Sequence, residues 1–214
     1  MNPLPQGPAK SMSDVFVLVF AWAFPCGEGL GFLLPGAVDL ESAFLPEPLT
    51  MLPIELLATT ADQAPLIRNL YQFYAYESSD WEQEDVEVDG RFYIHDEHLQ
   101  RYWGADGWGA YLVLADGFIA GFVLVERSEL PGIDAFELAD LFILKKYRRQ
   151  GIGRAVALQL LGGEGDWLMR CYAQDMPAVA FCNAVLAELS RPARPIALDD
   201  EPGLLNFLVT GARH

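Results

Sequence analysis

The sequence predicts an α/β (α+β) fold in which helices flank a central sheet, and two patterns along the chain carry this prediction. Asp116-Gly117 separates two apolar runs, over 111–114 and 118–125, which is a strong hairpin signal. An apolar run over 136–144 is followed by a glycine-containing turn and then by helical periodicity over 152–161. With 214 residues, of which 52% are hydrophobic, the chain suits one domain of ordinary size with a substantial core.

The predicted elements follow one another from residue 51 onward. Residues 54–58 are typical of a strand, and Thr60 with Gln63 forms a capping box that opens a helix reaching about Ala75. The remaining predicted elements are a short helix over 95–103, the hairpin strands over 111–114 and 118–125, a strand over 136–144, a helix over 152–161, a strand over 167–173, a helix over 176–189, and a closing hairpin of 196–198 with 205–209.

Residues 1–50 are predicted to lie outside this domain, which then spans 51–214. They are interpreted as an irregular extension or as the product of a start codon assigned too early. Val15 to Phe24 form a run of ten apolar residues, which as a helix spans about 15 Å against about 30 Å of bilayer hydrocarbon. The sequence therefore predicts no membrane-spanning helix, and the run lacks the cleavage site that a signal peptide needs.

The charge of the chain limits its partners. The formal net charge is −16, and a general nucleic-acid binder would need a basic face instead. A cationic or neutral small molecule is the favoured partner. The three cysteines, Cys26, Cys171 and Cys182, have no CxxC spacing and are odd in number, so a disulfide framework is not expected and a cytoplasmic location is predicted.

The basic turn Arg148-Arg149-Gln150-Gly151-Ile152-Gly153-Arg154 has the features of a phosphate site. Its two glycines let the backbone turn tightly, so that an anion can approach the amide groups. These amides belong to the first turn of a helix, where they lack intrahelical partners and the macrodipole is positive. The dinucleotide fingerprint does not fit, because its third glycine position is Val156, and the chain contains no P-loop run.

With its strand and helix, the pattern Arg148-x-x-Gly151-x-Gly153 resembles the signature of the GNAT superfamily of acyl-CoA-dependent N-acyltransferases. The order of the predicted elements matches that family, and the resemblance covers about residues 51 to 210. It implies a central mixed, mostly antiparallel sheet that is splayed at its middle strands. It also implies acetyl-CoA as co-substrate, with no metal.

The resemblance assigns most of the site residues. The pantetheine arm and the thioester carbonyl are expected at Phe142, Ile143 and Leu144. The residues assigned to the phosphates are Arg148, Arg149, Gln150, Gly151, Ile152, Gly153 and Arg154. Asp175 stands where the family's helix motif N-x-x-A-x-x-F-Y has its Asn, and it is assigned to the cofactor site.

The catalytic residues are left as alternatives. The resemblance implies a carboxylate base on the strand before the turn, and both Glu137 and Asp140 are candidates. Asp140 is favoured slightly because it lies nearer the expected splay, and a regular strand would point the two to opposite faces unless it contained a bulge. Cys182 stands at the family's usual Tyr position and is expected to be a buried small apolar residue, so that water or Tyr172 would return the proton.

The acceptor side is predicted from charge. Residues 77 to 89 hold seven carboxylates and no Lys or Arg, which would attract a protonated amine, although a solvated acidic loop explains them equally well. Tyr71, Tyr74, Tyr76 and Trp81 are candidate stacking surfaces. His95 and His98 lack a third ligand and are expected at the surface, so no metal site is predicted.

The first functional hypothesis is an N-acetyltransferase that moves an acetyl group from acetyl-CoA to a primary amine of a small cationic acceptor. The alternative is an acyl-CoA-binding sensor or regulatory module with little turnover, which the missing Tyr at 182 favours. A third hypothesis, a non-catalytic domain tethered to a membrane through residues 15–24, is disfavoured by the length of that run. A homodimer is compatible with the resemblance, but neither the acceptor nor the acyl chain is defined by the sequence.

Overall fold

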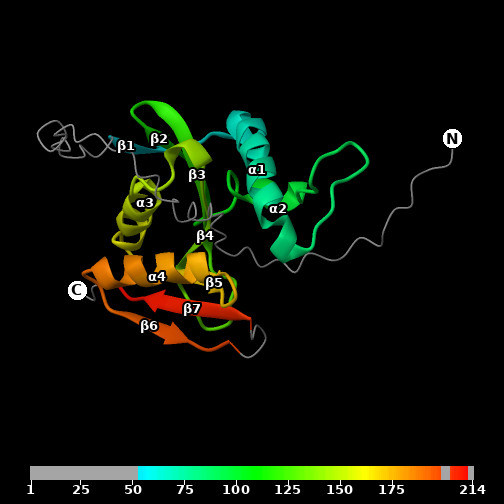
Figure 1. Cartoon of the computed structure of the whole chain (residues 1–214). Coiled ribbons are helices and arrows are strands. Elements are labelled where there is room, and N and C mark those ends of the chain that lie inside the picture. Colours follow the sequence, from blue (N-terminus) through cyan, green and yellow to red (C-terminus); the bar gives the residue numbers. More distant parts are fainter. Residues whose placement is uncertain (1–52, 199–202, 212–214) are drawn as a thin grey trace, which may run out of the picture.

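The computed structural model describes residues 53–198 and 203–211 (Figure 1). The expectations for residues 1–50 lie outside these residues. The strands are β1 (Ile54–Ala58), β2 (Gly109–Ala115), β3 (Phe118–Arg127), β4 (Phe136–Ile143), β5 (Trp167–Tyr172), β6 (Ala193–Ile196) and β7 (Leu204–Val209). The α-helices are α1 (Ala64–Glu82), α2 (Asp96–Arg101), α3 (Ile152–Leu161) and α4 (Met176–Glu188), and the short 3-10 turns are η1 (Ala61–Gln63) and η2 (Lys145–Tyr147).

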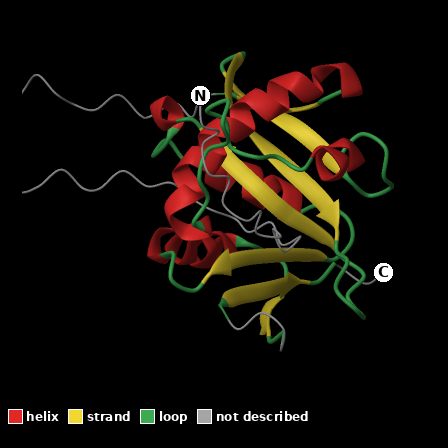
Figure 2. Cartoon of the chain, turned by 90° about the vertical axis from the view of Figure 1, so that its right-hand side faces the viewer, coloured by secondary structure: helices red, strands yellow, loops and turns green. Residues whose placement is uncertain are grey.

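The seven strands form one mixed sheet in the order β1-β2-β3-β4-β5-β7-β6. Every neighbouring pair is antiparallel except β4 and β5, which run parallel. The parallel pair is short, because only 136–138 of β4 pair with 167–169 of β5. The two strands then diverge, and Figure 2 shows the two halves of the sheet pointing in different directions. The predicted mostly antiparallel sheet with splayed middle strands is confirmed.

The helices cover the two faces of the sheet and define two cores (Figure 1). One core joins α3 and α4 to the sheet and contains Val156, Cys182 and Met169. The other joins α1 and α2 to the sheet and contains Ile67, Tyr74 and Phe122. Within the described part of the chain, no helix is both long and apolar enough to cross a membrane.

The local signals in the sequence place most elements correctly. The amide of Thr60 hydrogen-bonds the side chain of Gln63 at 3.0 Å, as the capping box predicts. Asp116 and Gly117 have φ values of 51° and 76°, which is the left-handed pair that a tight hairpin turn requires. In β3, Gly121 allows a close approach to β4, because a Cβ at this position would lie 1.9 Å from the carbonyl oxygen of Phe142.

Two predicted boundaries were wrong. The first helix does not end near Ala75 but continues to Glu82 and stops where Gln83 adopts a left-handed conformation with φ 55°. The first strand of the closing hairpin is 193–196, whereas 196–198 had been expected. It contains Pro195, which this position tolerates because β6 is the edge strand of the sheet.

Candidate active site

The basic turn joins β4 to α3 and has the geometry that its glycines predict. Gly151 adopts φ 78° and is the residue that caps the N-terminus of α3. The first helical bond runs from the amide of Ala155 to the carbonyl of Gly151 at 2.9 Å, so the amides at 152–154 precede the hydrogen-bonded ladder. Arg149 also has a left-handed φ of 65°. The turn therefore presents helix N-terminal amides to an anion, as predicted.

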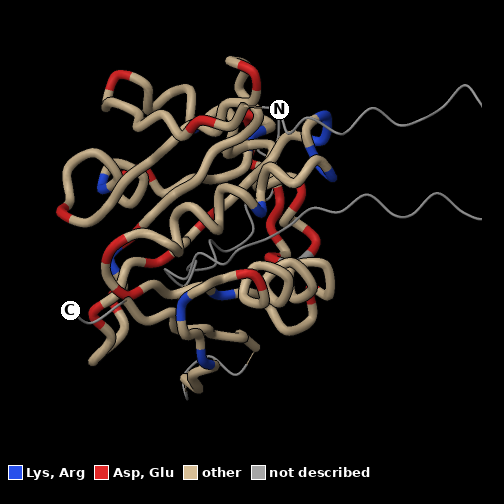
Figure 3. Tube along the Cα trace, turned by 90° about the vertical axis from the view of Figure 1, so that its left-hand side faces the viewer, with Lys and Arg blue, Asp and Glu red and all other residues tan. Residues whose placement is uncertain are grey.

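Positive charge is concentrated around this turn. Five of the fourteen Lys and Arg residues lie within ten positions, namely Lys145, Lys146, Arg148, Arg149 and Arg154. Elsewhere the trace carries few basic segments and many acidic ones (Figure 3). Arg154 lies 3.0 Å from Glu188, Arg148 lies 2.8 Å from Glu77 of α1, and Lys145 lies 3.8 Å from the same Glu77. An anion at the turn would meet the main basic site of a strongly acidic protein.

The end of β4 offers backbone groups on its open side. The amide of Leu144 donates to the carbonyl of Ala120 at 2.8 Å, so the backbone groups of Leu144 are directed toward β3. Because this direction alternates along a strand, the backbone groups of Phe142 are also directed toward β3. Leu141 and Ile143 direct theirs toward β5, and no β5 residue pairs with them in the described sheet. Of the three predicted pantetheine positions, Ile143 thus presents its backbone to the opening. Leu141 shares this orientation and was missed, because backbone direction depends on register.

A bulge in β4 places both candidate bases on one face. Leu124 pairs with Asp140 and Val125 with Leu138, which leaves Ala139 as the extra residue. Glu137 contacts Arg170 at 3.5 Å, and Asp140 lies beside Tyr74 of α1. The expectation that a regular strand would separate the two carboxylates therefore does not apply. Because the bulge puts Glu137 and Asp140 on the same face of the sheet, a single site can use both carboxylates.

The two carboxylates are nearly removed from solvent. Burial raises the pKa of Glu137 to about 7, although the neighbouring Arg170 acts in the opposite direction. Burial also raises the pKa of Asp140 well above its ordinary value, against a hydrogen bond with Tyr74 that lowers it. Because Asp140 is fully buried, an amine would need local opening or a water to reach it. Their assignment as bases stays a prediction.

The candidates for proton return differ sharply in their surroundings. Cys182 is a residue of α4 and is fully buried in the core between α4 and the sheet. A hydrogen bond with Cys171 and burial both raise the pKa of its thiol. It packs as the expected small apolar residue. Tyr172 ends β5 beside the opening, and its hydroxyl donates to Glu82 at 3.1 Å. Burial, and then the charge of Glu82, raise the pKa of Tyr172, so the hydroxyl keeps its proton at neutral pH.

Asp175 has a clear structural partner. Its side chain caps α4 by accepting a hydrogen bond from the amide of Ala178 at 3.0 Å, and it is buried. This contact explains why an acidic or amide residue suits the position. Its predicted role in cofactor binding is not tested by this contact and stays a prediction.

The acidic stretch is divided between a helix and a loop. Its first three members, Glu77, Asp80 and Glu82, lie on the last turns of α1, and the others follow in the loop before α2. Burial raises the pKa of both Glu82 and Glu84, and Glu82 adds to the effect on Glu84. The stretch is therefore more than a solvated loop, because its first part belongs to a helix that packs against the sheet.

The aromatic residues near this stretch do not all serve as expected. Tyr71 and Tyr74 are buried and pack against Phe122, so they belong to the core and offer no open stacking surface. Tyr76 is 67% exposed and remains available. The side chain of Trp81 lies outside the described residues.

His98 corrects another expectation. It was expected at the surface but is buried, with Nε2 3.2 Å from Oε1 of Glu126, and Tyr102 donates to the same carboxylate. His95 is exposed and caps the N-terminus of α2, because its Nδ1 accepts a hydrogen bond from the amide of His98. Over the residues that the structure describes, no group of His, Cys, Asp and Glu is arranged to hold a metal ion.

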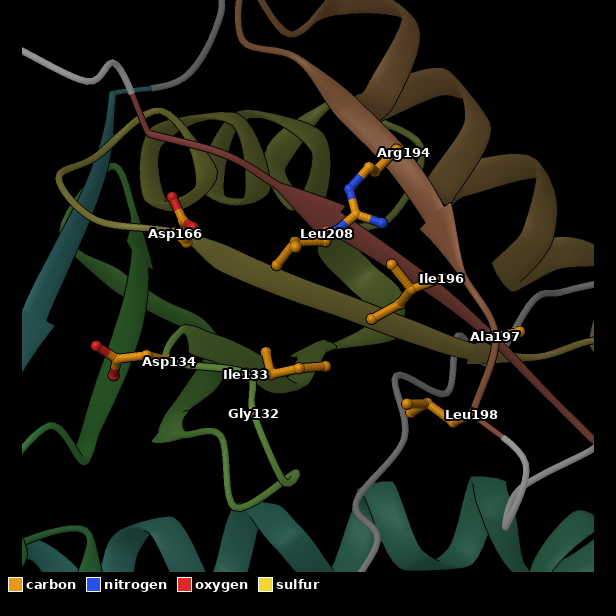
Figure 4. Close-up of a pocket in the computed structure, with 9 residues that line it drawn as sticks. All are labelled: Gly132, Ile133, Asp134, Asp166, Arg194, Ile196, Ala197, Leu198 and Leu208. Carbon is orange, nitrogen blue, oxygen red and sulfur yellow. The ribbon is translucent and has the colours of Figure 1, made fainter.

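Two cavities lie away from these residues. A cavity of about 190 Å³ is formed by residues 132–134 of the β3–β4 loop, by Asp166 and by residues of β6, β7 and the segment after β6 (Figure 4). A wider one, of about 580 Å³, lies between the end of β1 and the segment from Tyr102 to Tyr111. Neither is lined by a residue predicted for acyl-CoA or catalysis. The candidate site is the opening between β4 and β5, and it is defined by where these two strands stop pairing.

Comparisons with known proteins agree with this geometry. The family model described as "Acetyltransferase (GNAT) family" matches residues 67–183, more than half of the chain, and the chain belongs to this family. The match includes β4, the basic turn and most of α4. The resemblance seen in the sequence is confirmed, and with it the membership in a family of acetyltransferases.

Solved structures share the fold. An acetyltransferase from Thermus thermophilus has a TM-score of 0.52 at 18% identity, with 74% of this chain and 97% of that chain covered. A histone acetyltransferase HPA2 and related acetyltransferase from Corynebacterium glutamicum has a TM-score of 0.52 at 15% identity, with coverages of 75% and 98%. The ribosomal-protein-S18-alanine N-acetyltransferase from Escherichia coli has a TM-score of 0.50 at 14% identity, with coverages of 76% and 96%. Such low identities establish the fold alone. A search of curated proteins found no match.

The raised pKa of Glu137 makes stability depend on pH in a way that one substitution tests. Between its ordinary value of 4.5 and about 7, the folded protein holds this proton and the unfolded chain releases it, so this group's contribution to stability falls as pH rises. In Glu137→Gln this pH-dependent contribution to stability disappears, because glutamine does not titrate. We expect the free energy of unfolding of the variant, relative to the wild type, to rise by at most about 3 kcal/mol from pH 5 to pH 8. Urea denaturation at both pH values measures this difference, and an unchanged difference would contradict the burial of an ionisable Glu137.

Proposed function

We propose that the protein is an N-acetyltransferase that moves an acetyl group from acetyl-CoA to a primary amine of a small cationic acceptor. The observation that carries the proposal is the placement of the basic turn at the end of β4, where β4 and β5 part. Helix N-terminal amides surrounded by basic side chains therefore lie next to backbone groups of β4 that lack a strand partner. An extended pantetheine arm with a diphosphate at one end has matching chemistry.

The acyl-CoA would be held along its length. The diphosphate would lie at the amides of 152–154, with basic side chains around it. The amides of the pantetheine arm would pair with the backbone of Leu141 and Ile143, as a strand would. A backbone amide of this edge that the arm leaves unpaired would hold and polarise the thioester carbonyl. Phe142 and Leu144 would contribute side-chain contacts, because their backbone groups bond toward β3.

The reaction needs three events. The amine must lose a proton, its nitrogen must attack the thioester carbon, and the C–S bond must break with a proton returned to sulfur. Asp140 lies beside the opening and is assigned the amine proton, through a water because the carboxylate is buried. Glu137, on the same face, is the second candidate, since its pKa of about 7 suits a base near neutral pH. Tyr172 is assigned the return of the proton to sulfur.

The acceptor is assigned from the charge on the α1 side of the opening. The hydroxyl of Tyr172 donates to Glu82, and burial raises the pKa of Tyr172 with a further contribution from the charges of Glu82 and Glu84. Asp140 and Glu137 lie on the same side of the sheet. A cationic amine entering here would be attracted by several carboxylates and would relieve their mutual repulsion. A small amine with more than one positive charge fits this environment best. The protein is proposed to act in the cytoplasm, where acyl-CoA is available.

A second function, an acyl-CoA-binding sensor with little turnover, is favoured by one observation. Cys182 replaces the Tyr that the family motif has in this helix, and its thiol is buried among apolar residues. Both functions require acyl-CoA binding. They differ in whether thiol is released when an amine is supplied.

Release of free thiol from acetyl-CoA tests the proposed enzyme directly. With saturating acetyl-CoA and a series of aliphatic amines, we expect release that depends on the amine and that is faster for diamines and polyamines than for neutral amino compounds. A matched series at increasing ionic strength should slow the cationic acceptors most. Acyl-CoA binding without thiol release for any amine would contradict the enzyme and favour the sensor.

The turn itself is tested by Gly151→Val. Gly151 has φ 78°, so a β-branched residue there would distort the turn and direct a side chain at the anion site. We expect acetyl-CoA binding, measured by calorimetry, to weaken at least 100-fold. Gly132→Val is the matched control, since Gly132 has φ 77° in open space far from the turn and carries the same backbone strain. Equal acetyl-CoA affinities of the two folded variants would contradict the phosphate assignment.

A further inference from the structure

Arg148, the first residue of the basic turn, is held by an acid from a distant part of the chain. Its guanidinium contacts both carboxylate oxygens of Glu77, at 2.8 and 3.0 Å, across 71 positions of sequence. The two side chains are only 15% and 10% exposed. A pair so far removed from water is screened less than a surface ion pair. Lys145 lies at the edge of the same carboxylate, at 3.8 Å.

The same guanidinium occupies the open side of β4. Its Nε donates to the carbonyl of Ile143, and its centre lies 5.3 Å from the ring of Phe142. The carbonyl of Ile143 is one of the groups that the proposed function gives to the pantetheine arm. Arg148 therefore rests on a backbone acceptor that the arm would use, with its charge directed at Glu77.

Other hydrogen bonds within the turn also support its shape. The side chain of Gln150 donates to the carbonyl of Lys146 at 2.9 Å, and the amide of Ala155 bonds the carbonyl of Gly151. Both contacts brace the turn locally. The ion pair with Glu77 instead neutralises a basic residue of the phosphate site and brings a negative charge close to it. For an anionic ligand both effects are unfavourable.

We propose that Glu77 sets the affinity for acyl-CoA by competing with the phosphates for Arg148. This inference rests on the proposed function. In the ligand-free protein the guanidinium lies between Glu77 and the carbonyl of Ile143. When acyl-CoA binds, Arg148 leaves that carbonyl to the pantetheine arm and turns its charge toward the phosphates. Glu77 is thus an affinity-determining residue, and it is not an acceptor ligand as its place in the acidic stretch first indicated.

Calorimetric titration of CoA into Glu77→Gln tests the competition. Glutamine has the shape of glutamate and can still accept from Arg148, so the fold is expected to be kept, which thermal unfolding checks. We expect the dissociation constant for CoA to fall about three- to tenfold. In Arg148→Gln it should rise, and in the double variant Glu77→Gln with Arg148→Gln the gain from removing the carboxylate should be lost.

Glu188→Gln is the matched control. It also removes one carboxylate that pairs with an arginine of the turn, Arg154 at 3.0 Å, but this pair is about half exposed. We expect less than a twofold change in CoA affinity. A dissociation constant for CoA that is unchanged or higher in Glu77→Gln overturns this inference but leaves the proposed function intact. The same holds if Glu188→Gln gains as much CoA affinity as Glu77→Gln does, or if Glu77→Gln gives the same gain in the Arg148→Gln background. Absence of CoA binding to the wild-type protein overturns the proposed function and this inference with it.

Discussion

The candidate site exists because β4 separates early from β5. The parallel pair holds for three residues, after which the backbone groups of Leu141 and Ile143 lose a strand partner. Backbone groups without a strand partner are costly unless another group satisfies them, as the guanidinium of Arg148 does for the carbonyl of Ile143. The same separation places the basic turn next to these groups and lets Tyr172 and the α1 carboxylates face the opening. A continuous sheet would pair these backbone groups and close the opening.

Charge organises the two sides of this opening differently. The turn gathers five basic residues in a chain of net charge −16, whereas the α1 side gathers carboxylates. If the proposed function holds, an anionic donor and a cationic acceptor would be directed to opposite sides of one opening. The ion pair between Glu77 and Arg148 joins the two sides, so a substitution on one side is expected to affect the other side. Burial of Glu137 and Asp140 lets the sheet carry carboxyl groups whose pKa values lie above their ordinary range.

Local patterns in the sequence were sufficient for most of the fold and for the backbone geometry of the basic turn. The bounds of α3 and the Asp116-Gly117 hairpin follow from short-range signals, and the structure confirms them. The end of α1 was wrong because seven carboxylates in thirteen residues resemble a loop, and neither Gly nor Pro marks the end at Glu82. The bulge at Ala139 and the burial of His98 depend on strand register and tertiary contact. Glu77 was grouped with an acceptor site because its partner lies 71 positions away.

We propose that the basic turn binds the phosphates of an acyl-CoA. Thermal unfolding with acetyl-CoA, and separately with acetyl-pantetheine at the same concentration, tests this assignment. The two ligands share the thioester and the pantetheine arm, and only the first carries the nucleotide diphosphate. A native-state ligand raises the midpoint by mass action. We expect a clear rise with acetyl-CoA that weakens with added salt, and little or none with acetyl-pantetheine. Equal rises with both ligands, or none with either, would contradict the account.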